Sequence, residues 1–89
     1  MATKAQHSRR YRQVPLFLRS LREEAELTQR ELGAKLGRPQ SWVYNCETGN
    51  RRVDIAEFWE WCDACGVAAA EAIKRLYPAV GTTSGRAAR

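Results

Sequence analysis

Residues 28–49 of this 89-residue chain read TQRELGAKLGRPQSWVYNCETG, and this stretch predicts two short helices joined by a tight turn. Thr28, with Glu31 three residues later, fits a capping box, so the first of these helices is expected over 29–36. Gly37 suits the left-handed residue that commonly ends such a helix.

The second helix is expected over 39–48, because Pro39 suits a first helical position, where the N–H that proline lacks would have no partner. Two helices joined by so short a turn form a helix-turn-helix unit, whose second helix can enter the major groove of DNA. The helical repeat turns Val43 and Cys46 towards the core. It turns amide and hydroxyl side chains outward, and such groups can read base edges. This outward set is Gln40, Ser41, Tyr44 and Asn45.

The run LREEAELTQREL (21–32), followed by Leu36-Gly37 and Glu47-Thr48-Gly49, resembles the lambda-repressor-like domain of phage and bacterial regulators, the Cro/XRE helix-turn-helix family. The resemblance covers about residues 16–67. It implies an all-α, compact five-helix domain whose helix-turn-helix is formed by helices 2 and 3. It also implies that the outward set contacts bases, and that Arg22 and Glu47 form a partly buried structural ion pair.

The resemblance further implies phosphate contacts around the unit. Gln29 would lie at a helix N-terminus, which favours anions, and Arg51 and Arg52 would lie in a loop along the DNA backbone. Trp42 either covers the seam between helices 2 and 3 or presents its indole N–H to a phosphate. Gly33 stands where the family usually has Ala, which suggests unusually close packing, for example beneath Trp42. The expected phosphate-contacting residues are Gln29, Arg38, Trp42, Thr48, Asn50, Arg51 and Arg52.

The charge distribution points to nucleic acid as well. The net charge is +5 and the pI is about 9.6, values common among nucleic-acid-binding domains. Residues 1–13 carry four basic residues and no acidic one, whereas the chain between this segment and the last ten residues has nine bases against ten acids. We expect a flexible basic N-terminal arm at 1–13, the DNA-binding domain at 14–78 and a disordered C-terminal tail at 79–89. The arm either contacts phosphates or a minor groove, or is simply solvated.

Three further helices complete the expected fold, and the first of them is expected to begin at residue 14 or 15 and to run to about Glu26. Asp54 with Glu57 forms a second capping box, which starts a helix that ends at Gly66 and has Ile55 on its core face. The fifth helix is expected over 68–77. In related regulators the elements after the recognition helix form a two-fold dimer interface, and one of the two tryptophans of the fourth helix should be exposed. The expected interface residues are Trp59, Trp61, Ala72 and Leu76.

No catalytic constellation is visible, so the sequence predicts no enzymatic activity, no cofactor, no metal site and no small-molecule ligand. Cys62 and Cys65 are expected to be core residues, and the one histidine, His7, falls in the arm. No apolar run approaches the roughly 20 residues that a membrane span needs. An odd number of cysteines without a signal peptide favours the cytoplasm.

Together these features predict a transcriptional regulator that binds specific double-stranded DNA. It would be a repressor of phage, prophage or mobile-element type, and it would bind a palindromic operator as a homodimer through the helix at 39–48. The alternative is an antitoxin or a small protein-interaction module that uses the same fold to bind a toxin or RNA polymerase. In that case the acidic side chains of the fourth and fifth helices, with an exposed tryptophan, would form the docking face.

Overall fold

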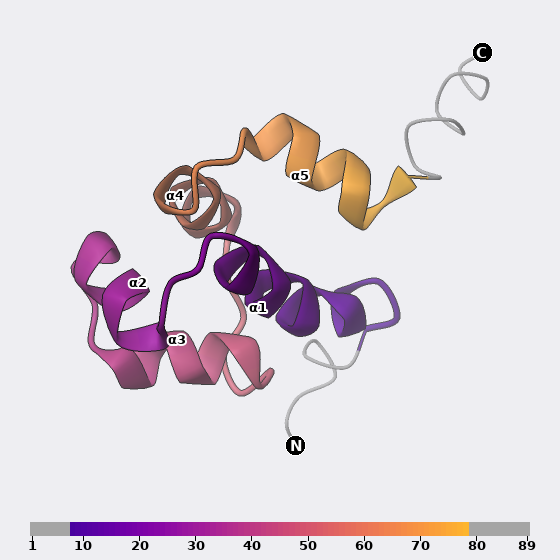
Figure 1. The fold of residues 1–89 in the computed structure, drawn as a ribbon. Coiled ribbons are helices and arrows are strands. Elements are labelled where there is room, and N and C mark those ends of the chain that lie inside the picture. Colours follow the sequence, from indigo (N-terminus) through magenta and orange to yellow (C-terminus); the bar gives the residue numbers. More distant parts are fainter. Residues whose placement is uncertain (1–7, 79–89) are drawn as a thin grey trace, which may run out of the picture.

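The computed structural model describes residues 8–78, and our expectations for residues 1–7 and 79–89 lie outside that part. Five α-helices pack around one core, and no strand occurs within 8–78, so the predicted all-α, five-helix fold is confirmed (Figure 1). A short 3₁₀ helix, η2, precedes them. The elements are η2 (Tyr11–Gln13), α1 (Val14–Glu24), α2 (Gln29–Leu36), α3 (Gln40–Glu47), α4 (Ile55–Ala64) and α5 (Ala69–Leu76).

Both predicted capping boxes are present. At the start of α2, the Glu31 amide donates to Thr28 Oγ1 at 3.0 Å, and the Thr28 amide donates to Glu31 Oε1 at 2.8 Å. At the start of α4, Asp54 and Glu57 exchange the same pair of bonds at 2.8 and 2.9 Å. Each box satisfies two amides that the helix itself leaves without acceptors.

Helix α1 ends earlier than the expected limit near Glu26. Its last residue is Glu24, and Glu26 has a left-handed backbone with φ 61°. The Leu27 amide donates back to the carbonyl of Arg22 at 3.2 Å, which closes a Schellman-type turn. A glutamate in the position that glycine usually occupies gave no sequence signal for this end.

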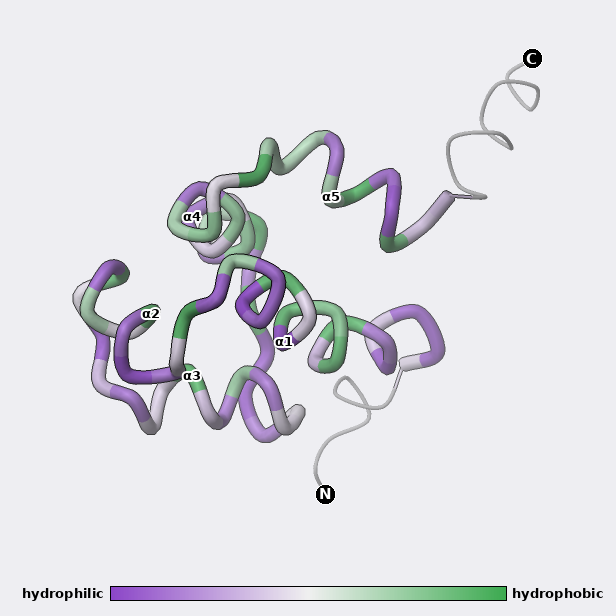
Figure 2. Tube along the Cα trace, in the orientation of Figure 1, coloured by the Kyte–Doolittle hydropathy of each residue, from purple (hydrophilic) through white to green (hydrophobic). Residues whose placement is uncertain are grey.

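The core is built from buried side chains of η2 and of all five helices. Hydropathy alternates along each helix, as Figure 2 shows most clearly for α1 and α5. Trp61 is completely buried, and its indole N–H donates to the carbonyl oxygen of Leu18 at 3.1 Å. Val43 and Cys46 are fully buried, as the helical repeat predicts. The largest fully buried side chains are Trp61, Leu18, Leu21, Leu32, Val43, Cys46 and Cys62.

The expected dimer-interface residues are mostly core residues, and the prediction is corrected here. Trp61 and Ala72 have no exposed surface and Leu76 is 7% exposed, because α4 and α5 turn these side chains into the protomer's own core. Trp59 is the exposed tryptophan of α4, at 64%. Ile55, expected on the core face of α4, is the first residue of the helix and is 78% exposed, since the buried positions of α4 begin only at Phe58.

The N-terminal boundary is also corrected. We expected a flexible arm up to residue 13, but Tyr11 is buried, with 8% of its surface exposed, and its hydroxyl accepts a hydrogen bond from the Val53 amide at 2.9 Å. Residues 8–13 therefore belong to the folded domain. None of the helices within 8–78 is long and apolar enough to cross a membrane.

Gly33 is explained by the turn between α2 and α3. A Cβ atom at Gly33 would lie 2.6 Å from the carbonyl oxygen of Arg38, a backbone atom that cannot rotate away. The close approach is to the turn itself, and not to the Trp42 side chain that the sequence suggested. An alanine at this position would force the second helix of the unit away from the first.

We therefore expect Gly33→Ala to lower the free energy of unfolding by about 1–3 kcal/mol, the usual cost of overpacking. The expected change is opposite in sign to the effect of helix propensity, which alone would raise the free energy of unfolding by about 0.5–1 kcal/mol. Urea unfolding followed by circular dichroism measures the difference. Ala34→Gly, at the exposed neighbouring position of α2, calibrates the propensity effect alone. A more stable Gly33→Ala protein would contradict the contact.

Candidate nucleic-acid interface

Helices α2 and α3 are joined by a three-residue turn that fixes their crossing. Gly37 is left-handed with φ 69°, and the Arg38 amide donates to the carbonyl of Gly33 at 2.9 Å. Pro39 is extended and is the N-cap of α3, which begins at Gln40, one residue later than the start that we expected at Pro39. The turn leaves one long side of α3 at the edge of the domain (Figure 1).

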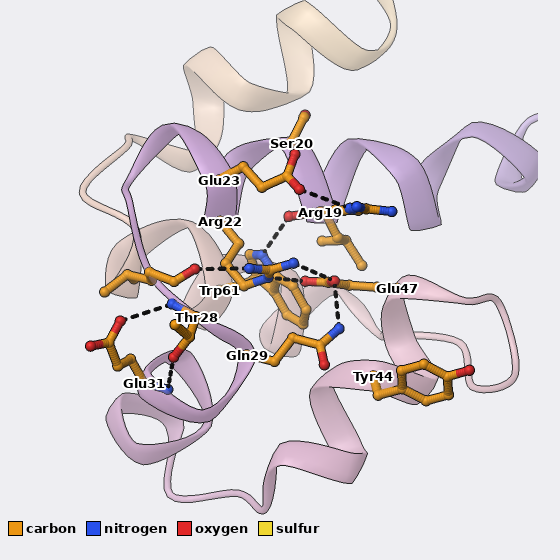
Figure 3. Close-up of polar contacts among 12 residues, drawn as sticks. Arg19, Ser20, Arg22, Glu23, Thr28, Gln29, Glu31, Tyr44, Glu47 and Trp61 are labelled. Carbon is orange, nitrogen blue, oxygen red and sulfur yellow. Dashed lines mark hydrogen bonds and ion pairs between the residues drawn. The ribbon is translucent and has the colours of Figure 1, made fainter.

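The outward set lies on this side of α3. Gln40, Ser41 and Tyr44 are exposed, and Asn45 is half-buried. Figure 3 shows the Tyr44 ring pointing away from the polar network behind the helix. The structure therefore brings all four residues that were predicted to contact bases onto one helix and its outer face.

An ion pair lies behind α3, between residues 25 positions apart in the chain. Arg22 of α1 donates from Nε and Nη2 to the two carboxylate oxygens of Glu47 at 2.6 and 3.0 Å (Figure 3). The Arg22 and Glu47 side chains are 11% and 2% exposed. A third bond runs from Arg22 Nη1 to the carbonyl of Leu27 at 2.8 Å. The hydrogen bonds that Arg22 donates to Glu47 raise the pKa of Arg22 above its ordinary value, so the guanidinium stays charged despite its burial.

Two glutamines extend this pair to the surface. Gln29 Nε2 donates to Glu47 Oε1 at 3.0 Å, and Gln40 Nε2 donates to Gln29 Oε1 at 2.7 Å. The side chain of Gln29, which we expected at a phosphate, is half-buried and is held by its hydrogen bonds with Glu47 and Gln40. A glutamine amide has two N–H donors and one acceptor oxygen, so Gln40 keeps one N–H and its oxygen for another partner.

The end of α3 has its own polar contacts. Asn50 Nδ2 donates to Asn45 Oδ1 at 3.3 Å. The Thr48 hydroxyl donates to the carbonyl of Tyr44 at 2.9 Å. Both Thr48 and Asn50 are exposed, and they lie within the turn that follows the helix.

A second ion-pair cluster, centred on Glu57, lies next to α3. Its carboxylate accepts two bonds from Arg51, at 3.0 and 2.9 Å, and Arg38 Nη2 lies 3.8 Å from it. Both guanidiniums lie over the Trp42 ring, at 4.5 Å for Arg38 and 5.0 Å for Arg51. We call these four residues the Glu57 cluster. The hydrogen bonds from Arg51 lower the pKa of Glu57 and raise that of Arg51.

The Glu57 cluster corrects two of the expected phosphate contacts. The indole N–H of Trp42 is buried and finds no hydrogen-bond partner in the described part of the chain, so it is not presented to a phosphate. The ring instead lies at the seam and contacts Trp61, with a centroid distance of 6.2 Å. Arg51 is held by Glu57 rather than extended towards a ligand. The sequence identified Glu57 only as a helix cap, and the i, i+6 pairing across a loop has no local pattern that would predict it.

Arg52 points to a different neighbour. Its side chain is exposed, and its guanidinium lies 4.1 Å from the centroid of the Tyr11 ring. Tyr11 was the residue that our sequence reasoning missed. It is a single aromatic residue among arginines and belongs to no apolar repeat, so the only available signal was the ring itself.

The three cysteines do not form a reactive or metal-binding group in the described residues. Cys46 and Cys62 are buried and Cys65 is half-buried, and all three are free thiols. Burial raises the pKa of each thiol to about 11, so each is protonated at neutral pH. Within 8–78 no three His, Cys, Asp or Glu side chains gather in a way that would hold a metal ion.

Comparison with known proteins agrees with this geometry. Residues 16–74 match the model of a family described as a helix-turn-helix domain. Among solved structures, the chain is similar to an XRE-family like protein from Pseudomonas syringae pv. tomato str. DC3000. The two share 40% sequence identity, with a TM-score of 0.73 over 84% of this chain and 92% of that one. No curated protein matches the sequence.

The Glu57 cluster generates a prediction about acid stability. Because the folded protein holds the pKa of Glu57 below its ordinary value of 4.5, the unfolded chain binds this proton more readily. The contribution of Glu57 to stability is therefore complete above pH 4.5 and is lost as the pH falls through the lower, folded value. Glu57→Gln should be less stable than the wild type at neutral pH and should lose less stability on acidification.

Chemical unfolding at several pH values between about 7 and 3 tests this expectation. Glu60→Gln removes an exposed carboxylate from the same helix and serves as the matched control. If Glu57→Gln and Glu60→Gln show the same dependence on pH as each other, Glu57 has no special coupling to folding.

Proposed function

The chain belongs to the Cro/XRE-type helix-turn-helix family and is a DNA-binding regulator, and we propose that it recognises a specific operator sequence by placing α3 in the major groove. The observation that carries this proposal is the chain of bonds from Arg22 through Glu47 and Gln29 to Gln40. It orients the first side chain of α3 before any ligand arrives. A preorganised side chain loses less conformational freedom on binding, which favours specific over diffuse contacts.

The base contacts follow from the groups that stay available. Gln40 retains an N–H and an oxygen, the pair that can grip N6 and N7 of adenine. Asn45 offers the same chemistry one turn later, and Ser41 offers a hydroxyl that donates or accepts. We assign Tyr44, 49% exposed, to the same base-contacting face.

The phosphate contacts frame this face. We assign them to Arg38 and Arg52, to the exposed Thr48 and Asn50 after α3, and to the N-terminus of α2 at Gln29. Phosphate contacts set the register and the salt dependence of binding, while the choice of sequence depends on the bases. Arg51 and Trp42 act behind the interface by supporting α3.

We further propose that the protein acts as a repressor in the cytoplasm and binds a palindromic operator as a homodimer, with half-sites about 34 Å apart. The support for the homodimer is the apolar surface of α4, where Trp59 is 64% and Ile55 is 78% exposed. An exposed tryptophan is typical of an interface.

A second candidate function depends on the same tryptophan. Trp59 lies beside the exposed acidic residues Glu60 and Asp63 on α4, a surface that suits a basic protein partner such as a toxin or a site on RNA polymerase. This candidate does not require α3 to read DNA.

The deciding experiment is a selection of bound sites from random duplex DNA, followed by anisotropy titrations of the enriched site at two salt concentrations. An enriched palindrome that still binds at the higher salt concentration supports specific dimeric recognition. If no sequence is enriched and binding disappears with salt, the contacts are electrostatic only, and the protein-interaction function leads.

We expect Gln40→Ala and Asn45→Ala each to weaken binding to the enriched site by about 1–3 kcal/mol, because each removes a bidentate base contact. Binding to unrelated duplex DNA should stay unchanged. Anisotropy titration of both DNAs measures the two affinities, and circular dichroism checks the fold. An equal loss on both DNAs would contradict the assignment of these residues to base recognition.

We expect Trp59→Ala to shift the monomer–dimer equilibrium towards the monomer, because truncation removes the largest exposed apolar side chain of α4. Analytical ultracentrifugation over a range of concentrations measures the shift. Leu16→Ala, which truncates a 68% exposed apolar residue on α1, is the matched control. Equal behaviour of the two variants would place the interface elsewhere.

A further inference from the structure

Residues 8–13, SRRYRQ, carry three arginines and no acidic residue. Arg9, Arg10 and Arg12 are exposed, and none of them forms an ion pair with a carboxylate of the described chain, 8–78. Other arginines are neutralised within the protein: Arg22 by Glu47, Arg51 by Glu57, Arg19 by Glu23 and Arg75 by Glu24. Three exposed arginines without a carboxylate partner thus lie within four consecutive positions at the start of the domain.

This segment is anchored to the fold at several points. Tyr11 is buried, and its backbone amide donates a hydrogen bond to Ser8 Oγ at 3.1 Å. Its hydroxyl accepts a hydrogen bond from the Val53 amide. The Arg12 amide donates to the carbonyl of Ser8 at 3.0 Å. The Tyr77 hydroxyl donates to the carbonyl of Arg10. The arginines therefore project from a held backbone.

The anchor places the segment at the C-terminal end of α3. Val53, which bonds to Tyr11, and Arg52, which lies over the Tyr11 ring, both belong to the loop that follows α3. A Cβ atom at Gly49, in the turn that ends α3, would contact Pro15 Cγ at 3.6 Å. In Figure 1 the start of the described chain and the end of α3 accordingly lie on the same side of the domain.

We propose that Arg9, Arg10, Arg12 and Arg52 form a phosphate-binding surface, here called the basic flank, which grips the DNA backbone beyond the C-terminal end of α3. The proposal rests on the proposed function, because α3 must be seated in the groove for the flank to reach the neighbouring phosphates. Guanidinium groups suit this ligand, since they offer several donors to phosphate oxygens. Tyr11 is a positioning residue that holds the flank beside the loop at 51–53.

The basic flank also compensates for the Glu57 cluster. Because Arg51 is held by Glu57, the loop after α3 offers less free charge than its sequence suggests. Tyr11 brings other arginines to the same loop. The protein then contacts a longer stretch of the duplex than the helix-turn-helix would contact alone.

The test uses the full chain and the enriched duplex, with Arg9→Gln/Arg12→Gln as the variant. Each lost phosphate contact should lower the slope of log affinity against log salt by about 0.9, so the double variant should lose up to about 1.8 per protomer. Specific and unrelated DNA should be affected alike, because phosphates carry no sequence information. Arg19→Gln/Arg75→Gln makes the same change in net charge on arginines paired to glutamates, and it should leave the slope unchanged.

Shortening the duplex gives a second readout. Wild-type affinity should fall when the base pairs flanking the site are removed, whereas Arg9→Gln/Arg12→Gln should respond little. Tyr11→Phe keeps the ring but removes the acceptor for the Val53 amide, and it should weaken the response to flank length in a protein that is still folded by circular dichroism.

Two outcomes would overturn the basic flank. One is an equal change of slope in both arginine double variants, which would indicate only long-range attraction. The other is an unchanged slope and an unchanged response to duplex length in Arg9→Gln/Arg12→Gln. In either case wild-type binding to the enriched site keeps the proposed function intact, and failure of the wild type to bind any duplex rejects that function first.

Discussion

The buried pair between Arg22 and Glu47 is the interaction on which the rest of the molecule depends. It joins the end of α1 to the last residue of α3, and its remaining donors and acceptors hold the loop at Leu27 and the amide of Gln29. Removing one partner of such a pair costs about 3–5 kcal/mol, because the other charge stays buried without compensation. The pair also neutralises a negative charge close to the proposed DNA-binding surface. Glu47 ends the helix assigned to DNA recognition, and full pairing at 2% exposure keeps its negative charge from opposing the phosphates.

Glu47 and Glu57 both hold α3 in place through ion pairs with arginines, Glu47 in the interior and Glu57 nearer the surface. Glu47 supports α3 from the core side, and Glu57 holds Arg38 and Arg51 around Trp42 next to the turns at either end of α3. The recognition helix, only eight residues long, would be marginal by itself. Its position is set by these charged contacts together with the burial of Val43 and Cys46.

Local patterns explain how much of this fold could be predicted. The caps at Thr28 and Asp54, and the helical repeat through Val43 and Cys46, depend on residues three or four apart, and all were correct. Contacts between residues far apart in the sequence could not be predicted in this way. Trp59 and Trp61 flank the same apolar stripe, and Trp61 is the buried one because it bonds to the carbonyl of Leu18 on another helix and packs against the ring of Trp42. For the candidate site, the family pattern indicated the outward residues of α3, but it could not show that Arg51 is held by a capping glutamate or that Tyr11 anchors the preceding segment.

The contact between Tyr77 and the backbone of Arg10 has a topological consequence. The two ends of the described domain lie within the reach of one side chain, although 67 positions separate them in the sequence. Domains whose ends are close together tolerate circular permutation and insertion into a host protein. This recognition unit could therefore be transplanted into an exposed loop of another scaffold through two adjacent junctions, with little rearrangement of the helices between them.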